Sequence, residues 1–349
     1  MEIELLVILF IAGVIALGVV ALVAVFKVVA KIYPYAYLNA RIRAMHSRLL
    51  KKDDFTDLLD KPYNEIIYTL DKKYFPHLAS FIGSDFSYSS VDSALRASLI
   101  KDLAKIYRMV PANSKKFVSI ILSKYDLLVI QSIVRSSHAK LLGPNSIKDI
   151  VSVTEVFHKN FLDQGNFSLT SLYNELKGTA YHPIMEKHLE ELKKGHFLDF
   201  ELELDLLYFR RILHEAKSRP AKQFVKRLID MHNVSLVLKE LDPIIPGGKI
   251  PLVELEPYTK SAALPQLVGL LKKHGYEIAA YENKNQLEHS LYKDFTRFGQ
   301  GLLSGEPLSE NSLMGFIVIL QATSRNVNIL LKLKSHNFTK EQISEVLSI

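Results

Sequence analysis

Cysteine is absent from this chain of 349 residues. Its absence excludes disulfide bonds and thiolate metal sites, and it agrees with a reducing, cytoplasmic compartment. Glycine and proline are modest in number, at 15 and 13 residues, and no segment is of low complexity. A chain of this length and composition can bury a substantial hydrophobic core and can form two or three structural units.

The sequence also lacks the short motifs that accompany common catalytic chemistries. Gly247-Gly248-Lys249 matches part of a Walker A motif but lacks the upstream glycine and the following Ser or Thr. Neither His-Glu-x-x-His nor Gly-x-Ser-x-Gly occurs. Ser98 and Lys101 match Ser-x-x-Lys, a pattern that is common by chance and whose partner motifs are missing. We therefore predict no catalytic residue.

His182, Glu186 and His188 form the densest group of potential metal ligands. On a helix, His182 and Glu186 share one face while His188 points elsewhere. Two ligands rarely hold a catalytic metal, so we interpret the group as surface side chains and expect no metal and no cofactor.

Charge is missing from the stretch Leu5 to Phe26, which contains only Leu, Ile, Val, Ala, Gly and Phe. As a helix, its roughly 22 residues are about 33 Å long, enough to cross a hydrocarbon core of about 30 Å. We predict a membrane anchor here, marked by Leu5, Leu17 and Phe26, and we see no comparable run elsewhere.

The flanks of this stretch predict its orientation. Glu2 and Glu4 precede it, and basic residues follow it: Lys27, Lys31, Arg41, Arg43, Arg48, Lys51 and Lys52. The positive-inside rule then predicts a single-pass membrane protein with its body on the cytoplasmic face. The alternative is a cleaved signal peptide, but a positive n-region and a short apolar core are both missing.

The net charge of the chain indicates which kinds of binding partner are favoured. The chain has 44 Lys and Arg against 37 Asp and Glu, a net charge of +7. Such a mild excess suits an anionic membrane surface or an acidic partner, and it is too weak by itself to argue for nucleic acid.

Helical periodicity runs through the body. Ser93 to Val110 and Phe117 to Arg135 both carry apolar side chains at helical spacing, and Pro111 separates them. Later segments of similar length are interrupted at Gly195, at Pro220 and over 242–251. No long alternating pattern of a strand occurs, so we predict an all-α fold.

Two weak signals recur in the same order along the body. The first is a Leu followed four or five residues later by Tyr, ending at Tyr74, Tyr181 and Tyr276. The second signal is a polar residue followed nine residues later by a basic residue: Asp126 and Arg135, Asp230 and Lys239, Thr323 and Lys332. In the last two cases an Asn lies three residues after the first position, at Asn233 and Asn326. Both signals step by about 100 residues, which indicates three similar helical units.

These repeated polar positions allow two interpretations. An acid near the start of a helix and a base near its end are favourable with the helix dipole, which is a local role. In the functional interpretation, Asp126, Arg135, Asp230, Asn233, Lys239, Asn326 and Lys332 line a shared central cavity.

Three stretches resemble a known family. They are Tyr35 to Leu50, Leu228-Ile-Asp-Met-His-Asn233 continuing to Ile245-Pro-Gly-Gly-Lys-Ile250, and the segment from Pro307 to Lys332. Together they are similar to the C subunit of archaeal and bacterial A/V-type ATPases and to the d subunit of vacuolar ATPases. The resemblance implies three pseudo-equivalent helical units arranged as a funnel, and a protein that is not an enzyme.

The resemblance also implies partners. Family members lie on the proteolipid (c/K) ring, receive the foot of the central shaft, of the D and F type, and pass torque between them as one copy per complex. One departure stands out: the family usually has Lys-Glu-x-Glu before the last Asn, where this chain has Ala322-Thr323-Ser324-Arg325.

Five residues in the first family-like stretch are candidates for an interface with ring or shaft: Tyr37, Asn39, Arg41, Arg43 and Arg48. Arg41 and Arg48 lie about two turns apart, and the simpler interpretation of both is a solvated helix face.

We expect four segments: an anchor over 1–32 and helical units over 33–143, 144–246 and 247–349. An anchored rotor would collide with the stator unless its helix lay in the lumen of the ring, so we place the apolar helix there as a hypothesis. The alternative function is a membrane-tethered helical scaffold whose basic face binds anionic lipid or nucleic acid.

Overall fold

The computed structural model is built from helices. It describes residues 2–75, 78, 82, 87–139, 167–260, 263–279, 281–306 and 309–347, and within these ranges it contains no strand. The all-α prediction is confirmed. The predicted unit boundary at Gly143-Pro144 lies outside the described residues. The Gly and Ser residues of Phe81 to Ser90 predict a loop, which is wrong for its last residues because α5 begins at Tyr88; residues 81 and 83–86 lie outside the described part of the chain.

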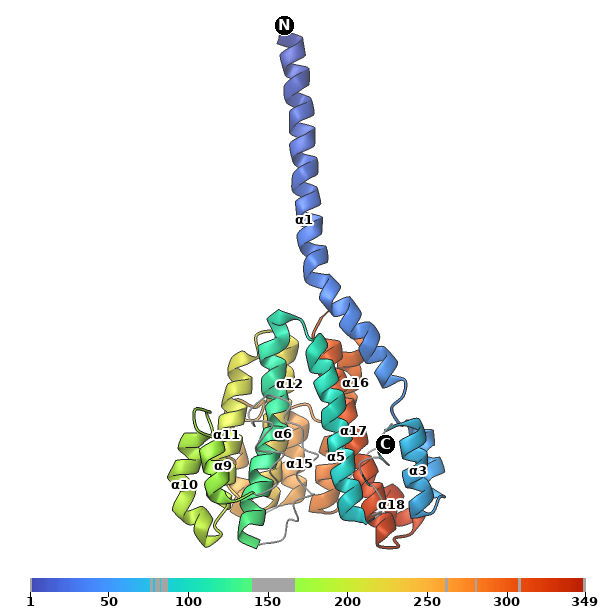
Figure 1. Ribbon diagram of the computed structural model, residues 1–349, viewed down its shortest axis with the longest axis vertical. Helices are drawn as coiled ribbons and strands as arrows, with labels where there is room; N and C mark the ends of the chain where they lie inside the picture. Colours follow the sequence, from blue (N-terminus) through green and yellow to red (C-terminus); the bar gives the residue numbers. More distant parts are fainter. Residues whose placement is uncertain are drawn as a thin grey trace.

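Helix α1 (Glu2–His46) joins the apolar stretch to the body without a break. Its 45 residues correspond to a helix about 67 Å long. Pro34 lies inside it and does not end it, and Figure 1 shows that α1 changes direction close to the body. A proline inside a helix removes one backbone hydrogen bond and favours such a bend. The predicted boundary at 32/33 therefore falls within a continuous helix.

The body contains the other helices: α2 (Lys52–Leu59), α3 (Tyr63–Lys73), α5 (Tyr88–Met109), α6 (Ala112–Ala139), α9 (Leu169–Glu175), α10 (His182–Lys194), α11 (Leu198–Glu215), α12 (Arg219–Leu238), α13 (Leu252–Leu255), α14 (Pro257–Lys260), α15 (Leu264–Lys273), α16 (Lys284–Ser304), α17 (Asn311–Ser335) and α18 (Lys340–Val346). Their ends follow the sequence. Gly195 ends α10 with a φ of 87°, and Ser218 caps α12 just before Pro220.

Six long helices contact one another in a closed order. In the order α5, α6, α11, α12, α16 and α17, each packs on the next, and α17 packs back on α5. Figure 1 shows these helices running roughly along the long axis of the body, with α1 rising above them. α12 also contacts α17 across this ring. The ring of six helices positions the cavities described below.

Helices α16 and α17 cross at close range. A Cβ on Gly315 would lie 2.4 Å from the carbonyl oxygen of Gly299 and 2.5 Å from the backbone nitrogen of Leu303. A Cβ on Gly299 would lie 2.6 Å from a methyl group of Val318. The two glycines therefore let the two backbones approach directly, which any side chain at Gly315 would prevent.

The buried apolar side chains form three clusters. The largest is built from α5, α6, α9, α10, α11, α12, α16 and α17, and it includes Tyr35, Leu38 and Ile42 of α1. The second joins α2, α3 and α5 to α17 and α18. The third joins the end of α12 to α13, α15 and α16. Since three residues of α1 enter the largest cluster, α1 is anchored in the core of the body.

Three described helices are long and apolar enough to cross a membrane by length and composition alone. They lie within Phe10–His46, Ala112–Ser137 and Asn311–Ser335. In the last two, 67% of the apolar window is buried inside the body, whereas none of the first window is buried. Unlike Leu5 to Phe26, both α6 and α17 contain charged residues, and their apolar side chains pack mainly into the core.

Candidate functional site

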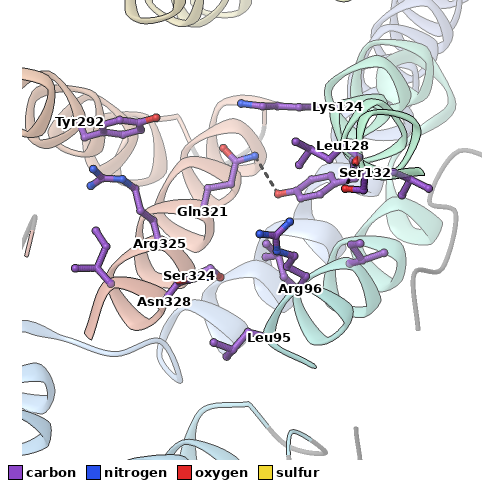
Figure 2. Close-up of a pocket in the computed structure, with 15 residues that line it drawn as sticks. Leu95, Arg96, Lys124, Leu128, Ser132, Tyr292, Gln321, Ser324, Arg325 and Asn328 are labelled. Carbon is purple, nitrogen blue, oxygen red and sulfur yellow. Dashed lines mark hydrogen bonds between the residues drawn. The ribbon is translucent and has the colours of Figure 1, made fainter. Parts of the chain in front are cut away.

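The ring of six helices has a cavity of about 390 Å³ that is open to solvent and is lined by α5, α6, α16 and α17. Its walls are mostly apolar, with Leu95, Leu99 and Leu128 among the lining residues. The charged lining residues are Arg96, Lys124 and Arg325, and no described carboxylate lines the cavity. Figure 2 shows Arg325 on one side of this space and Arg96 and Lys124 on the other. The cavity therefore suits an apolar group that carries negative charge.

Side chains from α6, α16 and α17 contact one another across this cavity. The Gln321 amide of α17 donates a hydrogen bond of 3.1 Å to the Tyr125 hydroxyl of α6, drawn in Figure 2. Arg325 lies over the ring of Tyr292, 4.0 Å from its centre. Burial raises the pKa of Tyr125 to about 12, so the phenol stays neutral and available as a hydrogen-bonding group.

A smaller cavity of about 160 Å³ adjoins the first, and both are lined by Lys124, Tyr292, Gln321 and Arg325. α11 and α12 contribute its remaining walls, including Phe209 and His232. Residues from five of the six ring helices thus line this cavity. Because the two cavities share four lining residues, they form one continuous space.

Three titratable groups face one another beside this second cavity. His232 Nε2 lies 3.8 Å from a carboxylate oxygen of Asp205. Burial, followed by the nearby Lys124 and Lys239, lowers the pKa of His232 to about 4. Burial raises the pKa of Asp205 to about 6, with Lys124 opposing the shift, and burial lowers the pKa of Lys124. At neutral pH this interior therefore holds a neutral imidazole beside a carboxylate.

Asp230, predicted to line a central cavity, instead organises a loop. Its carboxylate accepts hydrogen bonds from the backbone nitrogens of Lys249 (2.9 Å) and Ile250 (3.2 Å) and from the Tyr276 hydroxyl (2.5 Å). A Cβ on Gly248 would lie 2.0 Å from the carboxylate. The two family-like segments 228–233 and 245–250 are therefore in direct contact, and this contact requires glycine at position 248.

Asn233 fastens the same loop one turn later. Its amide nitrogen donates to the Ile245 carbonyl at 2.8 Å, and its carbonyl oxygen accepts from the Ile245 nitrogen at 3.1 Å. The side chain is fully buried, at 0% exposure. Both hydrogen bonds satisfy the backbone of a residue inside the core, which gives Asn233 a structural role.

The other repeat positions divide between the core and the surface. Asp126 and Asn326 are buried in α6 and α17, whereas Lys239 and Lys332 are exposed. Arg135 is exposed and forms two hydrogen bonds of 2.6 Å with Glu201 of α11. Asn326 lines a cleft outside the ring interior. The first polar positions of the repeated signal are therefore buried, and the basic positions that follow them are exposed.

The two repeat signals meet in space. Tyr276 binds Asp230 directly, and the carboxylate of Asp126 lies close enough to Tyr181 that, after burial, it helps to raise the pKa of that phenol. In both cases the acid belongs to one predicted unit and the tyrosine to the next.

The family-like stretch at the end of α1 presents a face to solvent. Tyr37, Arg41, Arg43 and Arg48 are exposed. None of these four side chains forms a hydrogen bond or ion pair within the described part of the chain. Tyr37 and Arg41 are four residues apart and share one face of α1, whereas Arg48 lies in the turn just beyond the end of this helix.

Asn39 faces the opposite way. It is buried, at 4% exposure, and neither its amide nitrogen nor its amide oxygen has a hydrogen-bond partner among the described residues. Of the anchor positions, Leu17 and Phe26 are 75% and 71% exposed, and Leu5 lies in the same helix.

Sequence reasoning missed the residues that line the ring interior, including Lys124, His232 and Tyr292. Asp205 and Tyr125 were missed as well. None of them belongs to the repeated positions, and only the order of helix contacts brings them together. One signal in the sequence was available, the segment Ala322 to Arg325 that differs from the family pattern. Ser324 and Arg325 line the larger cavity, and Ala322 and Arg325 line the smaller one.

The described residues contain no group of three His, Asp or Glu that could hold a metal ion. His188 pairs with Glu203 at 2.7 Å, so the group at 182–188 is not gathered around one point.

Comparison with known proteins identifies the family. Residues 38–346 match the family model described as ATP synthase (C/AC39) subunit. A relative from Pyrococcus horikoshii, named as the C subunit of an A-type ATP synthase, is 25% identical over 92% of both chains. Relatives with the same name from Pyrococcus abyssi and Methanocaldococcus jannaschii are 26% and 23% identical over 92% of this chain, and cover 92% and 88% of their own lengths.

The match covers almost the whole body and includes most of the three stretches on which the resemblance was based. The C subunit is a non-catalytic structural component of the rotary ATPase, which confirms the prediction that this protein is not an enzyme. The chain belongs to the ATP synthase (C/AC39) subunit family.

Proposed function

We propose that this protein is the central-stalk coupling subunit of a rotary ATPase that moves protons or sodium ions. In this role it joins the proteolipid ring in the membrane to the rotor shaft. The observation that carries the proposal is the continuity of α1, which runs unbroken from an exposed apolar segment into the largest core cluster. A continuous helix fixed by Tyr35, Leu38 and Ile42 can transmit force without slack.

The ring interior is the proposed seat for the foot of the shaft. It combines apolar walls with Lys124, Arg96 and Arg325, so an amphipathic segment with acidic side chains fits its chemistry. A closed order of six packed helices around it resists deformation, which a coupling element requires.

Three pseudo-equivalent units remain our proposal for the body, over 33–143, 144–246 and 247–349. Each contributes two neighbouring long helices to the ring, α5 with α6, α11 with α12 and α16 with α17. Asp126 lies near Tyr181, and Asp230 accepts a hydrogen bond from Tyr276, so an acid of one unit is close to a tyrosine of the next unit at both junctions.

We place the apolar part of α1 in the lumen of the proteolipid ring, with the body on the cytoplasmic face. In the view of Figure 1, the bend carries this part of α1 back over the middle of the body. A helix near the axis turns with the rotor, whereas a helix beside the ring would meet the stator in every turn.

Two exposed arginines, Arg41 in α1 and Arg48 just after it, provide the test. We expect Arg41→Glu with Arg48→Glu to abolish co-purification of the tagged chain with ring and shaft subunits in mild detergent. Both arginines are exposed and lack partners in the described chain, so the body should melt within about 1 °C of the parent.

The matched control is Lys222→Glu with Lys226→Glu, which reverses two exposed charges on α12. It should keep all ATPase subunits bound. If the tagged parent chain came down without any ATPase subunit, the proposal would fail. If the arginine variant melted early but assembled in the cold, the two arginines would serve stability instead.

A further inference from the structure

A second hollow lies outside the ring interior, on the other side of α17. It has a volume of about 460 Å³ and is formed between the junction of α1 with α2 and the helices α16 and α17. We call it the basic cleft. It shares only Thr296 and Ala322 with the smaller ring cavity, so it is a separate site.

The basic cleft is lined by five basic side chains: His46, Lys51, Lys52, Lys293 and Arg297. No Asp or Glu of the described residues lines it. These bases come from two segments that are far apart in the sequence, 46–52 and 293–297, so the fold brings the two groups together. Like charges gathered in a concave space raise the local positive potential, which attracts anions.

Of the bases in the cleft, Arg297 is paired with a carboxylate, and the two lysines at the start of α2 pair with none that the structure describes. Asp54 is engaged at 2.7 Å with the Lys51 backbone nitrogen and at 2.7 Å with the Tyr74 hydroxyl. Glu277 binds Arg297. Neither Lys51 nor Lys52 forms an ion pair with a carboxylate of the described residues. Burial, and then the charge of Lys51, lowers the pKa of His46, as expected beside uncompensated positive charge.

Polar groups complete the cleft. Thr323 and Asn326 line it from α17, both more than nine-tenths buried, at 5% and 3% exposure. Thr296 and Gln300 line it from α16. Hydroxyl and amide groups next to ammonium groups are the usual donors for phosphate oxygens.

The position of the cleft selects the source of the anion. His46 lies 20 residues beyond Phe26 along α1, about 30 Å of helix past the apolar segment. A lipid headgroup at the membrane surface would not reach that far, whereas a soluble anion would.

We propose that the basic cleft binds a soluble anion with two or more phosphate groups, of the size of a diphosphate or a nucleoside triphosphate. Lys51 and Lys52 contact the phosphates from the start of α2, and Lys293 faces them from α16. The proposal does not depend on the coupling function, because the binding is a property of the isolated chain.

Titration calorimetry on the full chain in detergent tests the proposal, with inorganic diphosphate and ATP as probes at about 0.15 M salt. We expect saturable binding of one anion per chain. Lys51→Ala with Lys52→Ala should weaken it at least about tenfold, since two charge-assisted contacts are lost. Lys222→Ala with Lys226→Ala removes the same charge from α12 and should leave the affinity within about twofold.

Lys293→Ala provides an independent variant on the opposite wall and should also weaken binding. The proposal is overturned if neither probe binds saturably, or if the α2 and α12 double variants lose affinity equally, which would indicate net charge alone. It is also overturned if vesicles of anionic lipid bind through Lys51 and Lys52 while soluble phosphates do not.

Discussion

Helices α1 and α17 are both apolar enough to cross a membrane, yet they lie in opposite surroundings. The apolar window of α1 has a mean hydropathy of 2.6 and no buried residue, while that of α17 has a value of 1.3 and is 67% buried. α17 carries polar residues at intervals, including Thr323, Asn326 and Arg325, and these reach the cavities and the cleft. Apolar length therefore does not decide the environment of a helix, and interspersed polar groups mark the one that packs inside the protein.

The largest effect should come from placing a charge on each helix. Ile317→Arg in α17 puts a guanidinium where the native side chain is 1% exposed, so we expect the body to fail to fold. Leu17→Arg in α1 should leave the melting temperature of the body unchanged but weaken membrane insertion by about 3 kcal/mol. Circular dichroism measures folding of the Ile317→Arg variant, and membrane fractionation measures insertion of the Leu17→Arg variant. A cooperative, native-like thermal transition of Ile317→Arg would contradict the proposed difference between the environments of α1 and α17.

A second pair of substitutions compares glycines in the two helices. Gly315→Val forces α16 and α17 apart and should lower the free energy of unfolding by about 3 kcal/mol. Gly13→Val meets nothing within 4 Å in the structure and should leave the stability of the body unchanged. Denaturant unfolding measures both, and equal losses in the two variants would contradict the close crossing.

The polar interior beside α17 should respond to pH through His232. Its folded pKa, about 4, lies below its ordinary value of 6.5, so the unfolded state binds the proton first on acidification. Stability from this group is present above pH 6.5 and is lost as the pH falls toward 4. Asp205, with its pKa raised to about 6, acts in the opposite direction, because its protonation favours the folded state.

The variant His232→Gln isolates the histidine contribution. Between pH 7 and pH 5, the parent should lose about 2 kcal/mol more of its unfolding free energy than the variant. Urea titrations at the two pH values provide the comparison. The same loss in both proteins would mean that the imidazole is not held neutral inside the ring.

The smallest effect should come from the surface. Arg135→Ala removes the pair with Glu201, in which the arginine side chain is 63% exposed. Because water screens such a pair, we expect a loss of about 0.5 kcal/mol. A loss several times larger in urea unfolding would show that the contact of α6 with α11 depends on this pair.

The sequence predicted the helical class, the exposed apolar segment and most helix ends, because these depend on local periodicity and on residues such as Pro111, Gly195 and Pro220. It did not predict that α1 continues through Pro34, since packing of Leu38 and Ile42 stabilises the helix beyond the proline. Asp230 was singled out by the spacing of the repeat, but its loop contacts could not be inferred from that spacing. The cavities required the closed order of six helices, which no local pattern contains.

Cross-linking tests the coupling role most directly, and the absence of cysteine makes every introduced cysteine unique. Leu17→Cys and Arg41→Cys, placed in the assembled complex, report on the apolar segment and on the exposed face of α1. The account predicts that Leu17→Cys links to the inner helices of the proteolipid ring and Arg41→Cys to ring or shaft subunits. Links from both positions to stator subunits alone would contradict it.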